Sequence, residues 1–277
     1  MKRLESLISS LLLCVLLVGS TAFAEELTGE EILARAKFGG ELRSEGSLIT
    51  TFRLESKTAD GITTANSFVG FSKRTKEGTE FLLLYFLDVG YNSGSILLME
   101  TPEQGTTRQW YYSPEWDLLR ELDVQAQGQS FAGSTLSFQN LGGYDLESHY
   151  TAEMIGNERL LVGETERMAH VLPLSAKPQE ELDFPTAKMW VDKETFFVLR
   201  VQKINPAGEV GETVYEVLAL GELEGAVTVD QLINSDCVNG SSTTITFLER
   251  RQPEDEFPDD FFSSENLALF DPAEYGF

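Results

Sequence analysis

The sequence contains very little cysteine and histidine and few basic residues. Of its 277 residues, two are cysteine, two are histidine and 21 are lysine or arginine, against 45 aspartate and glutamate. The formal net charge is therefore −24. Such an acidic surface repels nucleic acid and anionic lipid headgroups, so a nucleic-acid partner is excluded and a soluble monomer is favoured.

The scarcity of these side chains also limits the chemistry that the chain can perform. His149 and His170 lie on predicted strands without a second histidine or cysteine at ligand spacing, so a zinc site is not expected. Neither the dinucleotide-binding glycine pattern nor the phosphate-loop pattern occurs. Ser134 lacks the G-x-S-x-G context of a hydrolase nucleophile. We therefore expect no cofactor, no metal and no enzymatic activity.

The first 24 residues have the pattern of a secretory signal: a basic start, an apolar run at 11–18 and an A-x-A site at 22–24. The apolar run is too short to span a bilayer as a helix. Lipidation at Cys14 is the alternative, but large residues precede that cysteine. We expect cleavage after the A-x-A site, export to the periplasm, and one domain over residues 25–277. Cys237 would then be the single cysteine, which leaves no internal disulfide.

Most of the remaining sequence has the two-residue period of β-strands. In residues 48–54, for example, every second residue is apolar or Thr and shares one face. Turn signals such as Asp60-Gly61 separate consecutive strands. One helix stands apart, and it begins at a capping box formed by Thr28 and Glu31. This meander without a linker predicts one large antiparallel sheet, which must curl or close.

One predicted strand needs cover on both faces. Residues 79–89, TEFLLLYFLDV, are apolar on both faces, whereas an antiparallel strand normally keeps one face in water. Besides the first helix, the sequence offers only two short helix candidates, near residues 137–141 and 263–269. Either the sheet closes on itself, or a ligand fills the remaining space.

Three segments carry a resemblance: RQWYYSPEWDLLREL, SFAGSTLSFQNL and AKMWVDKETFFVLRVQKINPAGEV. They resemble the periplasmic outer-membrane lipoprotein-sorting family, and in particular its LolA-like branch. The matching residues are Trp110, Tyr112 and Pro114; Phe131, Gly133, Ser134, Ser137, Phe138 and Leu141; and Trp190, Val191 and Asp192. Thr135 and Asn140 stand where the family pattern usually has aspartate. The resemblance extends over roughly residues 28 to 270.

The resemblance implies a mainly β fold with a few helices. A single, strongly curved antiparallel sheet would form an unclosed half-barrel, with short helices as a lid on its concave face. A hydrophobic cavity would lie between sheet and lid. In this interpretation Ser134 caps a short helix that begins near Thr135 or Ser137. Strand alternation and the lid together predict the following lipid-binding cavity residues: Phe52, Leu54, Phe68, Phe81, Leu83, Tyr85, Trp110, Tyr112, Phe131, Leu136, Phe138 and Trp190.

The same resemblance implies a function. The chain would be a non-enzymatic periplasmic carrier that binds lipoprotein acyl chains or another long-chain lipid, for outer-membrane sorting or export. Its partners would be an inner-membrane transporter of the resistance-nodulation-division (RND) or ABC type and an outer-membrane acceptor. The alternative is an adaptor that senses lipid or lipoprotein and regulates or partners a membrane transporter.

Overall fold

The computed structural model describes residues 27–38, 46–88, 92–141, 146–178, 185–204, 210–258 and 260–277. The predicted signal at residues 1–24 and the N-P-A-G stretch at residues 205–208 lie outside these ranges. Within them, no helix is both long enough and apolar enough to cross a membrane.

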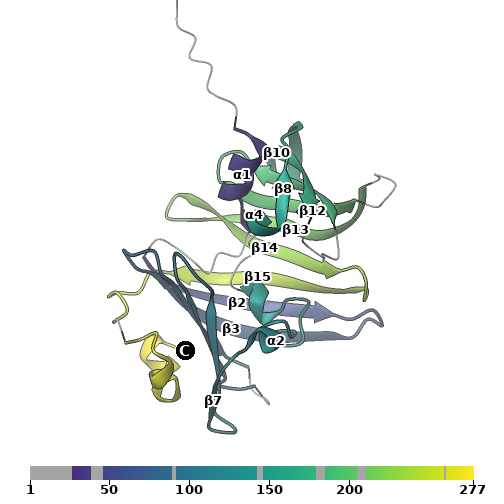
Figure 1. The fold of residues 1–277 in the computed structure, drawn as a ribbon. Coiled ribbons are helices and arrows are strands. Elements are labelled where there is room, and N and C mark those ends of the chain that lie inside the picture. Colours follow the sequence, from purple (N-terminus) through teal and green to yellow (C-terminus); the bar gives the residue numbers. More distant parts are fainter. Residues whose placement is uncertain are drawn as a thin grey trace, which may run out of the picture.

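The chain folds into one large sheet that is bent along its length (Figure 1). The strands are β1 (Lys37–Phe38), β2 (Ser47–Lys57), β3 (Thr63–Arg74), β4 (Glu80–Phe86), β5 (Ile96–Thr101), β6 (Arg108–Ser113), β7 (Leu118–Glu121), β8 (Tyr150–Ala152), β9 (Gly156–Val162), β10 (Thr165–Ala176), β11 (Thr186–Asp192), β12 (Phe197–Ile204), β13 (Val210–Leu223), β14 (Ala226–Asp236) and β15 (Ser241–Arg251). The helices are α1 (Gly29–Arg35), α2 (Val124–Gln127), α3 (Phe138–Leu141) and α4 (Leu146–His149), with 3-10 helices η1 (Ser264–Leu269) and η2 (Pro272–Tyr275).

Two meanders make up this sheet. Its strand order is β7-β6-β5-β4-β3-β2-β15-β14-β13-β12-β11-β10-β8. Strands β2 to β7 form one meander, in which each strand pairs with the next along the chain, and strands β10 to β15 form the other. The β2–β15 pair joins the two meanders. Strand β9 also pairs with β10, and the short β1 pairs with β12 in parallel. The sheet is not closed into a barrel, which confirms the predicted mainly β, unclosed architecture.

Local sequence signals explain most of these elements. The capping box at α1 is present: the Glu31 carboxylate accepts from the Thr28 amide at 2.8 Å, and the Thr28 hydroxyl accepts from the Glu31 amide at 3.2 Å. The turn glycines Gly61 and Gly78 both have φ of 86°, the left-handed conformation that a tight hairpin requires. Strand β14 has a weaker sequence signal, because polar residues such as Asp230 and Asn234 interrupt its apolar pattern.

The part of the sheet from β2 to β6 is apolar on both faces, as the sequence of β4 predicts. Leu82, Leu84 and Phe86 belong to a larger core, whereas Leu83 between them belongs to a smaller core. Because successive side chains on a strand point to opposite faces, the two cores lie on opposite faces of this part of the sheet. We call the face with the larger core face A and the other face B.

Different segments cover the two faces. Helix α1 contributes Ile32 and Leu33 to the larger core, which also contains Phe131 from the connection between β7 and β8. The C-terminal segment, residues 252–277, covers face B with Phe257, Phe262 and Leu267, all buried. In Figure 1 this segment, in yellow, lies on the far side of the β2–β7 half from α2. Short segments of the same chain therefore cover each face.

Candidate functional site

A row of phenylalanine side chains crosses face A. Phe247, Phe52, Phe68 and Phe86 are paired in register on the neighbouring strands β15, β2, β3 and β4. The Phe52 and Phe68 rings stack with centroids 5.1 Å apart, and the Phe68 and Phe86 rings meet edge to face at 4.6 Å. The sheet thus presents a continuous aromatic surface across four strands.

A short hairpin, residues 129–138, lies on this aromatic row, and we call it the lid hairpin. Its Phe131 is fully buried, with its ring centroid 5.3 Å from Phe68 and 5.5 Å from Phe86. The turn at its tip is closed by a 2.9 Å hydrogen bond from the Ser134 amide to the Phe131 carbonyl. Ala132 and Gly133 between them have φ of 51° and 72°, so this is a tight turn with two left-handed residues.

Hydrogen bonds tie the lid hairpin to strands on both sides of the aromatic row. Asn66 of β3 donates to the Ala132 carbonyl at 3.2 Å, and Thr243 of β15 accepts from the Thr135 amide at 2.8 Å. At the other end, Gln109 of β6 donates to the Phe138 carbonyl at 2.9 Å. The Thr135 hydroxyl also donates to the Asn234 carbonyl of β14 at 3.3 Å, so the hairpin spans face A from β6 to β14.

Ser134 has a different local role from the predicted one. Its hydroxyl accepts a hydrogen bond from the Leu136 amide at 3.1 Å, two residues along the chain. Helix α3 begins only at Phe138, so the prediction that Ser134 caps it is wrong. The polar side chain instead closes a turn within the hairpin, because its hydroxyl reaches an amide before any helical turn has formed.

The structure distributes the twelve predicted cavity residues over more than one surface. Five of them are buried in the larger core or packed against it on the sheet and lid of face A: Phe52, Leu54, Phe68, Phe131 and Phe138. Leu136 is buried within the lid hairpin. Five others lie in or against the smaller core on face B: Phe81, Leu83, Tyr85, Trp110 and Tyr112. Their contact with lipid stays a prediction, but the twelve do not line one surface.

Trp190 lies on β11, in the other half of the sheet. Its indole Nε1 donates to a Glu158 carboxylate oxygen at 2.8 Å, and the Lys188 ammonium lies 4.5 Å from its ring centroid. These two donors, the Trp190 indole first and then Lys188, hold the pKa of Glu158 below its ordinary value. Trp190 is thus fixed by polar neighbours on β9 and β11 and is separate from the aromatic row.

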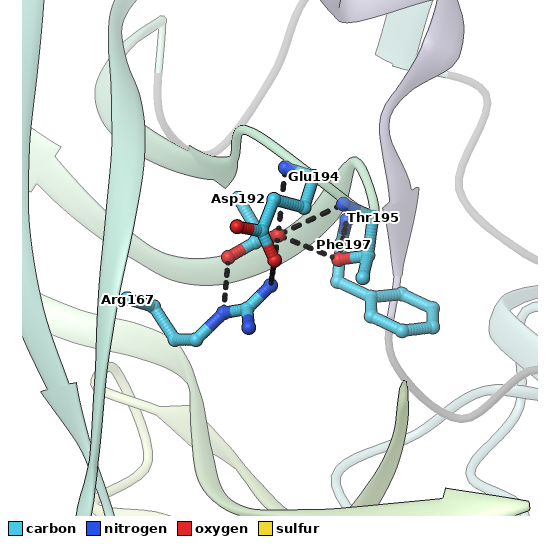
Figure 2. A network of polar contacts seen from close by, with 5 residues as sticks. All are labelled: Arg167, Asp192, Glu194, Thr195 and Phe197. Atoms are coloured by element: carbon cyan, nitrogen blue, oxygen red, sulfur yellow. Dashed lines mark hydrogen bonds and ion pairs between the residues drawn. The ribbon is translucent and has the colours of Figure 1, made fainter. Parts of the chain in front are cut away.

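Asp192, the last residue of the W-V-D motif, is the centre of a polar network in the β11–β12 turn (Figure 2). Arg167 donates to both carboxylate oxygens, from Nε at 2.7 Å and from Nη2 at 2.8 Å. The Glu194 amide donates at 3.0 Å, and the Thr195 amide and hydroxyl donate at 2.8 and 2.9 Å. Burial raises the pKa of Asp192, but these hydrogen bonds outweigh it and lower the pKa overall. The motif is therefore structural, and its partner Arg167 carried no signal in the sequence.

The described residues hold no group of three or more His, Cys, Asp or Glu side chains that could bind a metal ion. Cys237 is a half-buried free thiol, and burial raises its pKa, which disfavours the reactive thiolate. The described side chains of face A are mainly phenylalanine and aliphatic.

The sequence was compared with protein-family models and with curated proteins. A family model described as "Uncharacterized protein" matches residues 78–268, from β4 through the lid hairpin to η1. A search of curated proteins found no match. This matched range is more than half of the chain.

Several solved structures share the fold. A DUF1329 family protein from Desulfovibrio piger has a TM-score of 0.69 at 21% identity, over 86% of this chain and 97% of that one. A protein from Vibrio parahaemolyticus, named for an outer membrane lipoprotein-sorting domain, has a TM-score of 0.68 at 17% identity, over 87% and 98%. A LolA superfamily protein from Nitrosomonas europaea has a TM-score of 0.57 at 14% identity, over 86% and 98%. The chain therefore belongs to the family of the matching model, and its fold is that of the outer-membrane lipoprotein-sorting, LolA-like proteins.

Proposed function

We propose that the protein is a non-enzymatic periplasmic carrier that binds a long acyl chain on face A, beneath the lid hairpin. The observation that carries this proposal is the aromatic row of face A, which is covered by one short hairpin where a sandwich would have a second sheet. Cargo in this proposal is a lipoprotein acyl chain or another long-chain lipid.

The energetics explain why an aqueous compartment needs such a carrier. Moving one methylene group from an apolar site into water costs about 0.8 kcal/mol, so a sixteen-carbon chain costs on the order of 12 kcal/mol. A row of phenylalanine rings removes most of that penalty. The acidic surface of the protein disfavours adhesion to anionic membranes between loading and release.

The lid hairpin can open at modest cost relative to the whole fold. Among the described residues, four side-chain hydrogen bonds tie it to the sheet: those of Asn66, Thr243 and Gln109, and the one from the Thr135 hydroxyl to the Asn234 carbonyl. Each such hydrogen bond contributes about 1 kcal/mol net. Withdrawal of Phe131 from between Phe68 and Phe86 would make room for an acyl chain of similar apolar character. Acyl chain and Phe131 would then exchange places on the same aromatic surface.

The similar Vibrio protein is named for lipoprotein sorting, which supports lipoprotein acyl chains as cargo. In that role the carrier would load at an inner-membrane transporter of the RND or ABC type and deliver to an outer-membrane acceptor. An adaptor that only senses lipid would instead hold one membrane protein in a fixed ratio, and affinity purification from solubilised membranes distinguishes the two.

Titration with a fluorescent sixteen-carbon fatty acid tests the carrier proposal. The mature protein is expected to bind the probe at one site and to release it when unlabelled long-chain lipid is added. Ser134→Ala is expected to bind it equally and to show no difference in the hydrolysis of a lipid ester. Absence of probe binding would contradict the carrier, and ester hydrolysis lost in Ser134→Ala would contradict its non-enzymatic nature.

A further inference from the structure

A buried cation lies at one end of the aromatic row. Arg250 of β15 pairs in register with Thr50 of β2, two residues before Phe52 on the same face of that strand. The Arg250 guanidinium lies over the ring of Phe247, 4.3 Å from its centroid. Along β2, face A therefore changes from the aromatic side chain of Phe52 to the polar side chain of Thr50.

Arg250 is incompletely neutralised. Its side chain is 10% exposed, yet the ion pair that it makes among the described residues, from Nη1 to the Asp230 carboxylate at 3.2 Å, involves a partner that is 47% exposed. It also donates from Nη2 to the Val229 carbonyl. A guanidinium has five N–H donors, so most of them have no acceptor among the described residues.

Arg167 of the same protein, by contrast, is a mostly buried arginine with two acidic partners. It makes a bidentate pair with the buried Asp192 and a second pair with Glu194 at 2.9 Å. Hydrogen bonding to Asp192 raises the pKa of Arg167, whereas desolvation lowers the pKa of Arg250. A desolvated cation with weak pairing favours the arrival of an anion.

The neighbouring hydroxyl groups are also unused. Thr50 is 1% exposed and Ser72, on the adjacent strand β3, is 2% exposed. Neither side-chain oxygen has a hydrogen-bond partner among the described residues. Because a buried hydroxyl without a partner costs about 1–3 kcal/mol, these groups are more easily explained as ligand contacts than as packing.

We propose that Arg250 and Thr50 bind the anionic head of a single-chain amphiphile, a carboxylate or a phosphate, whose acyl chain lies over Phe247 and Phe52. This inference rests on the proposed carrier function and specifies its cargo. The bound anion accepts from Arg250 and Thr50 while Asp230, already half exposed, turns towards solvent. A cargo with a neutral head would supply no anion to pair with the Arg250 guanidinium.

The test compares an anthroyloxy-labelled stearic acid with its methyl ester, which has the same chain and no charge. Wild type is expected to bind the acid about tenfold more tightly, the effect of one charge-assisted hydrogen bond. Arg250→Gln is expected to lose this preference and to keep the affinity for the ester. Arg53→Gln, an exposed arginine of β2 paired with Glu55, removes the same charge and is expected to keep the preference.

Two further variants keep the proposal testable if Arg250→Gln does not fold. Asp230→Asn removes the competing carboxylate and is expected to bind the acid more tightly, and Thr50→Val is expected to bind it about threefold more weakly while melting at a higher temperature. Competition by lysophosphatidylglycerol against free palmitate then distinguishes a phosphate head from a carboxylate.

The outcomes separate the two proposals. Equal wild-type affinities for acid and ester, or a preference that survives in every folded site variant, would overturn the headgroup site and leave the carrier intact. Failure of wild type to bind either probe would overturn the carrier itself, and the headgroup site with it.

Discussion

At the scale of single residues, burial of charge is concentrated at a few positions of an otherwise highly charged chain. Asp192 is 1% exposed and is held ionised by Arg167 and the Thr195 and Glu194 amides. Removing one member of a buried pair leaves the other desolvated and unpaired, which is expensive. The stability of the β11–β12 turn therefore depends on the charge of one carboxylate.

Asp192→Asn is expected to lower the free energy of unfolding by about 3 kcal/mol at neutral pH. The folded-state pKa of Asp192 is lowered, so its contribution is present above the unfolded pKa of about 3.9 and is lost as pH falls through the folded value. Urea unfolding at several pH values should show the gap between variant and wild type shrinking below about pH 4. A gap that is constant with pH would contradict this account.

The control is an exposed ion pair between the neighbouring strands β9 and β10. Arg159 and Glu166 lie 3.2 Å apart with side chains 71% and 62% exposed. Glu166→Gln is expected to change the free energy of unfolding by less than about 0.5 kcal/mol, because exposed ion pairs contribute little.

At the scale of elements, the lid hairpin and the C-terminal segment are the parts that cover the sheet. The sequence predicts where both lie, through the glycine and serine of the 131–141 stretch and the short helix candidate near residues 263–269. It does not predict that the two cover opposite faces. Strand β4 is apolar at every position from Phe81 to Phe86, so alternation cannot say which of its residues meet which cover.

Locking the lid hairpin tests its movement. The Thr135 amide lies 2.8 Å from the Thr243 hydroxyl, which limits their Cα atoms to about 7 Å apart, close enough for a disulfide. Thr135→Cys with Thr243→Cys, in a Cys237→Ser background, is expected to bind the fatty-acid probe when reduced and to exchange it far more slowly when oxidised. Equal exchange rates in the two states, measured by stopped-flow fluorescence, would mean that the hairpin is not the lid.

Removing the C-terminal segment tests the cover of face B. Phe71 contacts the rings of five residues in that segment: Phe257, Phe261, Phe270, Tyr275 and Phe277. Deletion of residues 252–277 would expose the smaller core, so light scattering is expected to show self-association. Leu269→Ser, at a position that is 80% exposed in the same segment, is expected to stay monomeric. A monomeric deletion variant would show that the segment is dispensable as a cover.

At the scale of the whole molecule, the fold follows from the sequence more fully than the site does. Hairpin turns, the α1 capping box and the two-residue period predict a curved antiparallel meander, and the structure has one. The division of Phe52 and Leu83 between opposite faces depends on strand register, and the pairing of Arg167 with Asp192 depends on contacts across the β10–β11 pair. Neither can be read from a single sequence, because both arise when separate strands meet.

The most direct test of the carrier is native mass spectrometry of the mature protein purified from periplasm without detergent. The expected result is a bound species with the mass of one long-chain lipid, which organic extraction recovers in about one-to-one ratio with protein. Protein that is consistently free of lipid, and that takes up none when incubated with membrane lipid extract, would show that it is not a lipid carrier.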